Sequence, residues 1–270
     1  MRTPKLWALL VSSVVTLVLL ATSAVVGGQT PAYRAPRAPD GHPDLGGIWQ
    51  ALNTANWDIE AHAARPGPPQ FGALVAAPAG LGVVDGEIPY QPSAAAKKKE
   101  NFEQRWKEDP EAKCYLPGVP RANYMPFPFQ IVQGHDKIMM VYEYAATVRV
   151  IHMDKVPPSL VDTWMGHSVG RWDGETLVVD VSSFNGSAWF DRAGNFQSDS
   201  LHVVERYTPA SPEVLNYEAT IEDPKLYTRP WTMRMPLYRH VEKDAQLLEF
   251  KCVEFSEELL YGHLRKKPTR

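Results

Sequence analysis

Hydrophobic and polar residues alternate along the second half of the chain in short segments that turn residues separate. A period of two places successive side chains on opposite faces, which is typical of strands with one buried face. The segments, between residues 137 and 262, are KIMMVYEY, TVRVIHM, HSVGRW, ETLVVDV, SLHVVERY, EVLNYEATI, WTMRMPLYRH and QLLEFKCVEF. Their connections are mostly short and leave no room for crossover helices, so the pattern predicts an eight-stranded antiparallel meander.

A meander of eight strands closes most economically as an up-and-down β-barrel. Closure removes the exposed edges of the sheet and can leave a cavity for one small ligand. The expected fold class is therefore mainly β. The alternative is a curved open sheet with a helix across its mouth, as in cone-shaped α+β folds.

The first half of the chain predicts less regular structure around this sheet. Residues 29–42 are rich in proline and alanine and are expected as an extended lead-in. Residues 43–136 are expected to pack on the barrel as a first strand at PDLGGIWQ, a long irregular wrap and one helix. The helix should run from about residue 94 to 108, capped by Ser93. The segment CYLPGVPRANYMPFPFQIVQ is too rich in proline for regular structure and is expected as a covering loop.

The N-terminus carries Arg2 and Lys5 ahead of an apolar run from Leu6 to Ala21, with small residues after it. This is the layout of a secretory signal peptide, which we expect over residues 1–28. A retained membrane anchor is the alternative, although the run is slightly short for a span of roughly 20 residues. We therefore expect a periplasmic or secreted protein with no membrane segment after signal removal.

The net charge bears on whether the protein binds nucleic acid, and the cysteine content bears on whether its compartment is oxidising. The formal net charge is −3 and the basic tail at residues 263–270 is short, so a nucleic-acid surface is not expected. Cys114 and Cys252 are the only cysteines. An even number of cysteines in an exported chain favours one disulfide between them, and two buried thiols are the alternative.

Several motifs along the chain resemble those of a group of secreted bacterial proteins. They are PDLGGIW, CYLPGVPR, PFQIVQ, DTWMGHSVGRWDGETLVVDV, DSLHVVERY and IEDPKLYTRPW. The similarity as a whole spans roughly residues 43–255. The tripeptide GIW at the start of the first strand also looks like the Gly-x-Trp signature of lipocalins. The resemblance implies an exported, lipocalin-like barrel. It assigns no catalytic residue, because that group has no established activity.

The segment GHSVGRWDGETLVVDV predicts a tight hairpin that carries a histidine and an aspartate. A turn at Asp173-Gly174 favours the type I′ geometry, and counting outward from it places His167 directly opposite Asp180. The other face of the hairpin is more apolar, so the simplest interpretation sends His167 and Asp180 to solvent. The alternative is that the mixed faces point into the barrel.

If the mixed faces point inward, four residues on neighbouring strands are candidates for catalysis: His167, Asp180, His202 and Arg206. A histidine held by a carboxylate is a general base near neutral pH, and an arginine can stabilise a developing oxyanion. A surface or structural pair is the competing interpretation. The sequence contains no nucleophile elbow, HExxH, CxxC or calcium-loop motif, so we expect neither a metal nor a cofactor.

Aromatic and charged residues on the strands and loops are candidates for ligand binding. They are Trp164, Arg171, Trp189, Phe190, Asp191, Arg192, Glu218 and Trp231. The loop FNGSAWFDRAGNFQSDS carries four of them and is longer than its connection requires, which is typical of loops that gate or bind. The competing interpretation is a rigid structural loop held by Asp191 and Arg192. Glu218 could equally form a simple ion pair with Arg206.

Three functions fit these patterns. The first is an exported barrel that binds a small, largely apolar molecule, and it requires no catalytic residues. The second is a cofactor-independent lyase, isomerase or hydrolase with His167 and Asp180 as its base. The third is an envelope protein that assembles with others, for which an apolar outer face of the barrel would be the sign.

Overall fold

The computed structural model describes residues 33–67, 76–154, 156–157 and 159–250. The expected signal peptide, the basic tail and Cys252 lie outside these residues. Among the residues described, no helix has both the length and the apolar character to cross a bilayer.

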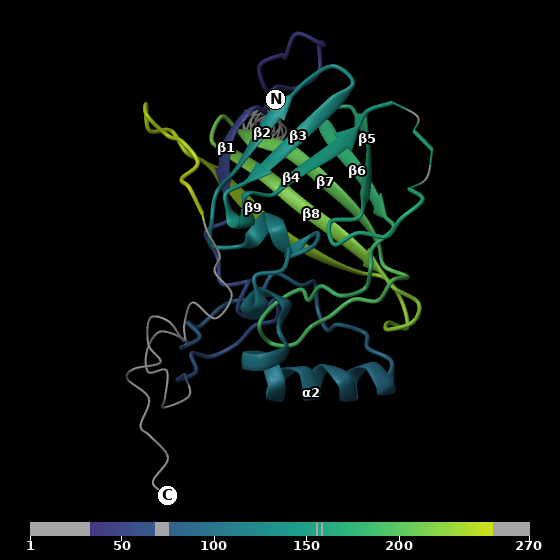
Figure 1. The fold of residues 1–270 in the computed structure, drawn as a ribbon. Helices are drawn as coiled ribbons and strands as arrows, with labels where there is room; N and C mark the ends of the chain where they lie inside the picture. Colours follow the sequence, from purple (N-terminus) through teal and green to yellow (C-terminus); the bar gives the residue numbers. More distant parts are fainter. Residues whose placement is uncertain (1–32, 68–75, 155, 158, 251–270) are drawn as a thin grey trace, which may run out of the picture. The chain divides into compact units, whose positions relative to one another are not determined.

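Nine strands form one closed barrel in the described chain (Figure 1). They are β1 (Gly47–Gln50), β2 (Phe129–Gln133), β3 (Lys137–Tyr142), β4 (Val148–His152), β5 (His167–Asp173), β6 (Thr176–Ser182), β7 (His202–Ser211), β8 (Val214–Glu222) and β9 (Trp231–Arg239). Each strand pairs with its neighbours in chain order, and β1 closes the ring by pairing with both β2 and β9. The mainly β, closed barrel expected from the alternation is confirmed.

The number of strands corrects the prediction of eight. β2 lies in the segment expected as a covering loop; prolines precede it, but from Phe129 onward buried and more exposed side chains alternate and the backbone pairs with β3. The last predicted strand, QLLEFKCVEF, is not a strand over residues 246–250, and its other residues lie outside the described chain. β1 occupies the place beside β9 instead.

One junction departs from a pure antiparallel meander. β4 and β5 run parallel, with Ile151 beside Ser168 and His152 beside Val169. The connection between them, residues 153–166, is long enough to carry the chain back before β5 begins. The other neighbouring pairs are antiparallel.

Alternation decides which side chains fill the barrel. On β7 and β8 every second residue is buried over most of the strand. Large side chains of the interior include Phe129, Tyr207, Tyr217 and Met233, which are at most 1% exposed. Burial of this apolar surface is the main force that stabilises the barrel.

Helix α2 (Pro92–Glu108) lies outside one end of the barrel (Figure 1). It begins two residues earlier than a cap at Ser93 would allow: Pro92 is in its first turn and Gln91 is the N-cap residue, so the predicted cap is wrong. Three short 3₁₀ helices follow: η2 (Pro110–Lys113), η3 (Arg121–Tyr124) and η4 (Tyr144–Ala146). The Asp109 side chain accepts a hydrogen bond from the Glu111 amide and so caps η2.

Candidate functional site

The hairpin of β5 and β6 has the expected faces but a different register. Asp173 pairs with Thr176, so the loop residue Gly174 takes the positive φ of 59° at the first central position of the turn. Glycine at that position is typical of a type II′ turn. Asp180 therefore lies opposite Val169, and its predicted direct pairing with His167 is wrong. The two remain on one face as diagonal neighbours.

The four candidate catalytic residues lie on the outer wall of the barrel. On the opposite hairpin face Leu177, Val179 and Val181 are at most 1% exposed, and Trp172 is partly buried. His202 Nε2 lies 3.0 Å from Asp180 Oδ1, and the two side chains are 38% and 46% exposed. The structure thus brings His202 to Asp180 on an open surface. The catalytic role of this pair stays a prediction.

His167 contacts a different partner, His152 on β4. Their ring centroids are 5.4 Å apart. Burial, with the nearby His167 and Lys137, lowers the pKa of His152. The Nε2 atom of His167 is buried and has no hydrogen-bond partner among the described residues.

Charged residues of the outer wall form surface ion pairs. Arg206 donates to Asp173 at 2.9 Å, although the register places it opposite Glu218. Glu218 instead accepts a bond of 2.6 Å from Arg234. Arg171 is exposed on β5. These pairs resemble ordinary surface electrostatics, which contributes little to stability.

Most of the aromatic residues predicted to contact a ligand are packed in the core. Trp189, Phe190 and Trp231 are at most 8% exposed. Phe190 meets Trp231 edge to face, with ring centroids 5.7 Å apart. Trp164 is half-buried and stacks on Tyr115 with centroids 5.1 Å apart. A part of these residues in ligand binding stays a prediction.

Sequence reasoning missed a polar cluster inside the barrel. Glu205 on β7 is fully buried and forms an ion pair with the buried Arg149 of β4. Its carboxylate also accepts hydrogen bonds of 2.8 to 2.9 Å from three neutral donors, namely Asn123, Tyr207 and Tyr217. Burial and the Glu205 charge raise the pKa of both tyrosines well above the usual value. The phenols therefore stay protonated, and the chain itself neutralises and solvates this carboxylate.

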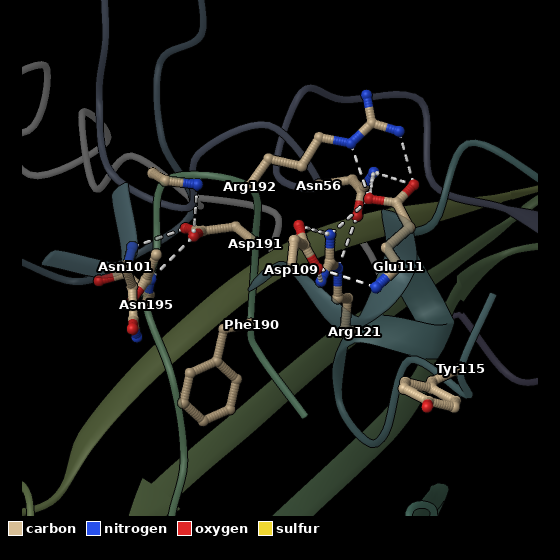
Figure 2. A network of polar contacts seen from close by, with 12 residues as sticks. Asn56, Asn101, Asp109, Glu111, Tyr115, Arg121, Phe190, Asp191, Arg192 and Asn195 are labelled. Atoms are coloured by element: carbon tan, nitrogen blue, oxygen red, sulfur yellow. Dashed lines mark hydrogen bonds and ion pairs between the residues drawn. The ribbon is translucent and has the colours of Figure 1, made fainter. Parts of the chain in front are cut away.

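A second network, here called the base network, consists of Asn56, Asp109, Glu111, Arg121 and Arg192 (Figure 2). Arg121, which is 1% exposed, donates to Asp109 at 3.0 and 3.2 Å and to Glu111 at 2.6 Å. Arg192 donates twice to Glu111, at 2.7 and 2.6 Å. Segments far apart in the sequence are therefore joined through one carboxylate.

Partners decide the ionisation of the base network. Burial alone would raise the pKa of Glu111, but the charges of Arg192 and Arg121 outweigh it and lower the value to about 2. Burial dominates at Asp109 and raises its pKa, even with Arg121 beside it. Glu111 is therefore the fixed negative charge at the centre of the network.

Asp191, next to the base network, is fully buried and is held by neutral donors (Figure 2). It accepts bonds of 2.9 Å from the backbone amides of Ile59 and Ala193. Asn195 donates to it through its backbone at 3.1 Å and its side chain at 2.6 Å. Burial and the neighbouring Asp58 raise the pKa of Asp191 to about 7. Asp191 and Arg192 thus both anchor the long loop after β6.

A pocket of about 440 Å³ opens beside this loop. It is formed by the irregular wrap, the first turns of α2 and the connection between β8 and β9. The residues that line it are Glu60, Glu87, Ile88, Pro89, Tyr90, Ala95, Lys98 and Arg229. None of them was a candidate from the sequence, because three separate segments supply them. Arg229 alone lies in one of the motifs, IEDPKLYTRPW, and the resemblance assigns that motif no role.

One hydrogen-bonded chain connects the pocket to Asp191. The Tyr90 hydroxyl donates to Asn195 Oδ1 at 2.8 Å, and the Asn195 amide donates to Asp191. Gly194 brings the loop against α2: with φ at +88°, a Cβ there would lie 2.8 Å from the Lys98 carbonyl oxygen. Glycine therefore lets the loop touch the helix at the turn that carries one wall of the pocket.

Metal binding has no support in the described residues, which contain no group of three or more His, Cys, Asp or Glu side chains placed to hold an ion. Comparison with known proteins adds no assignment: no protein-family model matches the sequence, and no curated protein matches it significantly. Membership of the group that the motifs resemble stays a prediction.

Proposed function

We propose that this chain is an exported protein that binds a small molecule in the pocket beside α2. The pocket carries the proposal. Its volume of about 440 Å³ lies within the usual range for small-molecule sites. Four of its eight lining residues are charged and four are apolar or aromatic, so it offers polar groups that can orient a ligand.

The surroundings of the pocket support binding at this place. Its walls are loops and a helix fixed by the base network and by the contacts of Asp191, so the site is held before any ligand arrives. Inside the barrel, by contrast, Glu205 and Arg149 form an ion pair with each other, which leaves neither charge free for a ligand. We therefore propose a ligand outside the barrel, where the sequence led us to expect one inside it.

Export is supported by the N-terminal pattern and by the contacts around Cys114. Phe250 packs on Tyr144 with ring centroids 5.0 Å apart. The Tyr144 hydroxyl in turn lies 3.5 Å from the carbonyl oxygen of Tyr115, the residue after Cys114. Cys252 follows Phe250 by two residues in the sequence, and we propose that it forms a bridge to Cys114, as an oxidising compartment would favour. Intact mass with alkylation before and after reduction tests it.

A pair of variants on α2 tests the binding site. Ala95 lines the pocket, whereas Ala96 is exposed on the same helix and does not. Ala95→Trp should fill the pocket, and Ala96→Trp adds the same bulk outside it. A fragment library is screened by NMR against the mature wild-type protein, and the hits are then titrated against both variants.

We expect hits that bind the wild type and Ala96→Trp alike and that bind Ala95→Trp at least about tenfold more weakly, because an occupied pocket excludes them. Matching melting temperatures of the two variants would show that both fold. Hits that bind all three proteins equally would contradict the proposal.

A further inference from the structure

Some polar groups that line the pocket already have partners within the chain, so only the remaining groups are available to a ligand. Lys98 donates to Glu60 at 3.0 Å, so these two charges neutralise each other. The Tyr90 hydroxyl donates its hydrogen bond to Asn195. The Pro89 carbonyl accepts from the backbone and the hydroxyl of Thr228, at 2.9 and 3.2 Å.

Two charged groups of the pocket remain unengaged. Glu87 is exposed and has no hydrogen bond or ion pair within the described part of the chain. Arg229 is also exposed, and its guanidinium makes a single long bond of 3.4 Å to the neighbouring Pro230 carbonyl. The pocket therefore presents one free anion and one free cation, on two different segments of the chain.

The rest of the free surface is apolar. Pro89 and Ala95 supply aliphatic surface, whereas Ile88 is 4% exposed and adds little. Tyr90 also lines the pocket; its hydroxyl donates to Asn195, and its ring contacts Phe196 and Tyr227 on the side of the protein. Such a surface suits an aliphatic or aromatic group, and aromatic rings add a preference for planar partners.

We propose that the ligand is a small zwitterion with an apolar side group, such as an α-amino acid or a dipeptide. Its carboxylate pairs with Arg229, where guanidinium geometry allows two parallel hydrogen bonds. Its ammonium group pairs with Glu87, and its side group lies against Pro89, Ala95 and Tyr90. This identification rests on the proposed function, because it names the ligand class of the same pocket.

Charge balance favours this class over its simpler relatives. The lining residues comprise two acids and two bases, so the empty pocket is neutral. A ligand with only a carboxylate leaves Glu87 unpaired beside it, and one with only an ammonium group leaves Arg229 unpaired. A zwitterion compensates both charges and keeps the pocket neutral, so that neither charge is desolvated without a partner.

The test is a matched panel of ligands, titrated by calorimetry into the mature protein at pH 7. The panel contains phenylalanine, leucine and leucyl-phenylalanine, each with an N-acetylated form that lacks the ammonium group and a C-amidated form that lacks the carboxylate. We expect the zwitterions to bind and each blocked form to bind about fivefold more weakly or worse, as for a partly exposed charged hydrogen bond.

Two variants assign each charge to its residue. Arg229→Gln should abolish the penalty for amidation and keep the penalty for acetylation, and Glu87→Gln should do the reverse. Arg171→Gln and Glu213→Gln remove exposed charges outside the pocket-lining residues, and both penalties should persist in them.

The outcomes separate this inference from the proposed function. If blocked and zwitterionic forms bind equally, the zwitterion is overturned while the pocket remains a binding site. The same holds if no panel member binds but a library hit is excluded by Ala95→Trp. If no compound of either set is sensitive to Ala95→Trp, both the inference and the proposed function are overturned.

Discussion

Glu111 and Asp191 lie in adjoining parts of Figure 2, and both carboxylates are largely or fully removed from solvent. Glu111 is contacted by two arginines, which hold its pKa at about 2. Asp191 is contacted by amide N–H groups alone, and its pKa is raised to about 7. Burial disfavours the charged form of both carboxylates, so the presence or absence of a cationic partner decides whether the pKa falls or rises. One carboxylate is a permanent tie between segments, and the other titrates near neutral pH.

The largest effect on stability should come from removing Arg121, one of the two arginines that contact Glu111. Arg121→Met should lower the free energy of unfolding by about 3 to 5 kcal/mol, because it leaves Asp109 buried without its cation. Urea denaturation at pH 7 measures the change. Arg171→Met, on the exposed wall, is the control and should change stability by less than about 0.5 kcal/mol. Equal losses in the two variants would remove the distinction between buried and exposed arginines.

Asp191, which contacts no cationic side chain among the described residues, should dominate the pH dependence of stability near neutral pH. The folded pKa of Asp191, about 7, lies above its ordinary value of 3.8, so the folded state holds the proton more tightly. The stabilisation is fully present below pH 4 and is lost as the pH rises through 7. The loss amounts to at most about 4 kcal/mol, since one pKa unit corresponds to about 1.4 kcal/mol.

Denaturation from pH 4.5 to 8 checks this against Asp191→Asn, which cannot titrate. The wild type should lose stability relative to the variant across this range, and parallel curves would refute the assignment. Glu111 acts in a separate window: its folded pKa of about 2 lies below the ordinary 4.5. Its stabilisation is therefore present above pH 4.5 and lost as the pH falls toward 2.

A smaller change should sharpen the comparison at Asp191 itself. Asn195→Ala removes the side-chain donor to this carboxylate, which should cost about 2 kcal/mol at pH 8, where Asp191 is charged. The cost should shrink at pH 5, and the pKa of Asp191, followed by carboxyl NMR, should rise further. Asn216→Ala, at an exposed position of β8, is the control. A cost independent of pH would mean that the amide serves packing rather than the charge.

The smallest effect belongs to the outer wall. Arg206→Ala breaks a pair with Asp173 whose side chains are 38% and 63% exposed, so we expect a loss of at most about 1 kcal/mol. Raising the salt concentration to 1 M should reduce that loss further, because solvent-exposed charges are screened. A loss comparable to that of Arg121→Met would show that the outer wall is not simply solvated.

Sequence patterns predicted the fold wherever burial follows alternation. The strands from β3 to β9 and the buried face of the hairpin came from this signal. β2 did not, because the prolines before Phe129 concealed the start of a five-residue strand. The hairpin register was missed because Asp-Gly fits the two central positions of a type I′ turn, whereas glycine also fits the first central position of a type II′ turn, which Gly174 takes here.

The polar interior and the pocket were beyond the reach of a single sequence for different reasons. Glu205 stood alone on the apolar face of its strand, which is a usable signal that a partner must be buried with it. Its partner Arg149 lies 56 residues away along the chain, on a strand that does not pair with β7. Only closure of the barrel brings the two together. The pocket depends on loop packing, which alternation does not encode.

The pairing of Trp49 with Arg239 joins the first strand to the last. A growing chain that has reached β8 still lacks the strand that seals the ring, so β1 and β8 each keep an open edge until residues 231–239 emerge. Long-range closure of this kind is slow compared with local hairpin formation. The molecule therefore remains incomplete through most of its synthesis, and fragments that end before residue 231 should aggregate through those edges rather than form a smaller barrel.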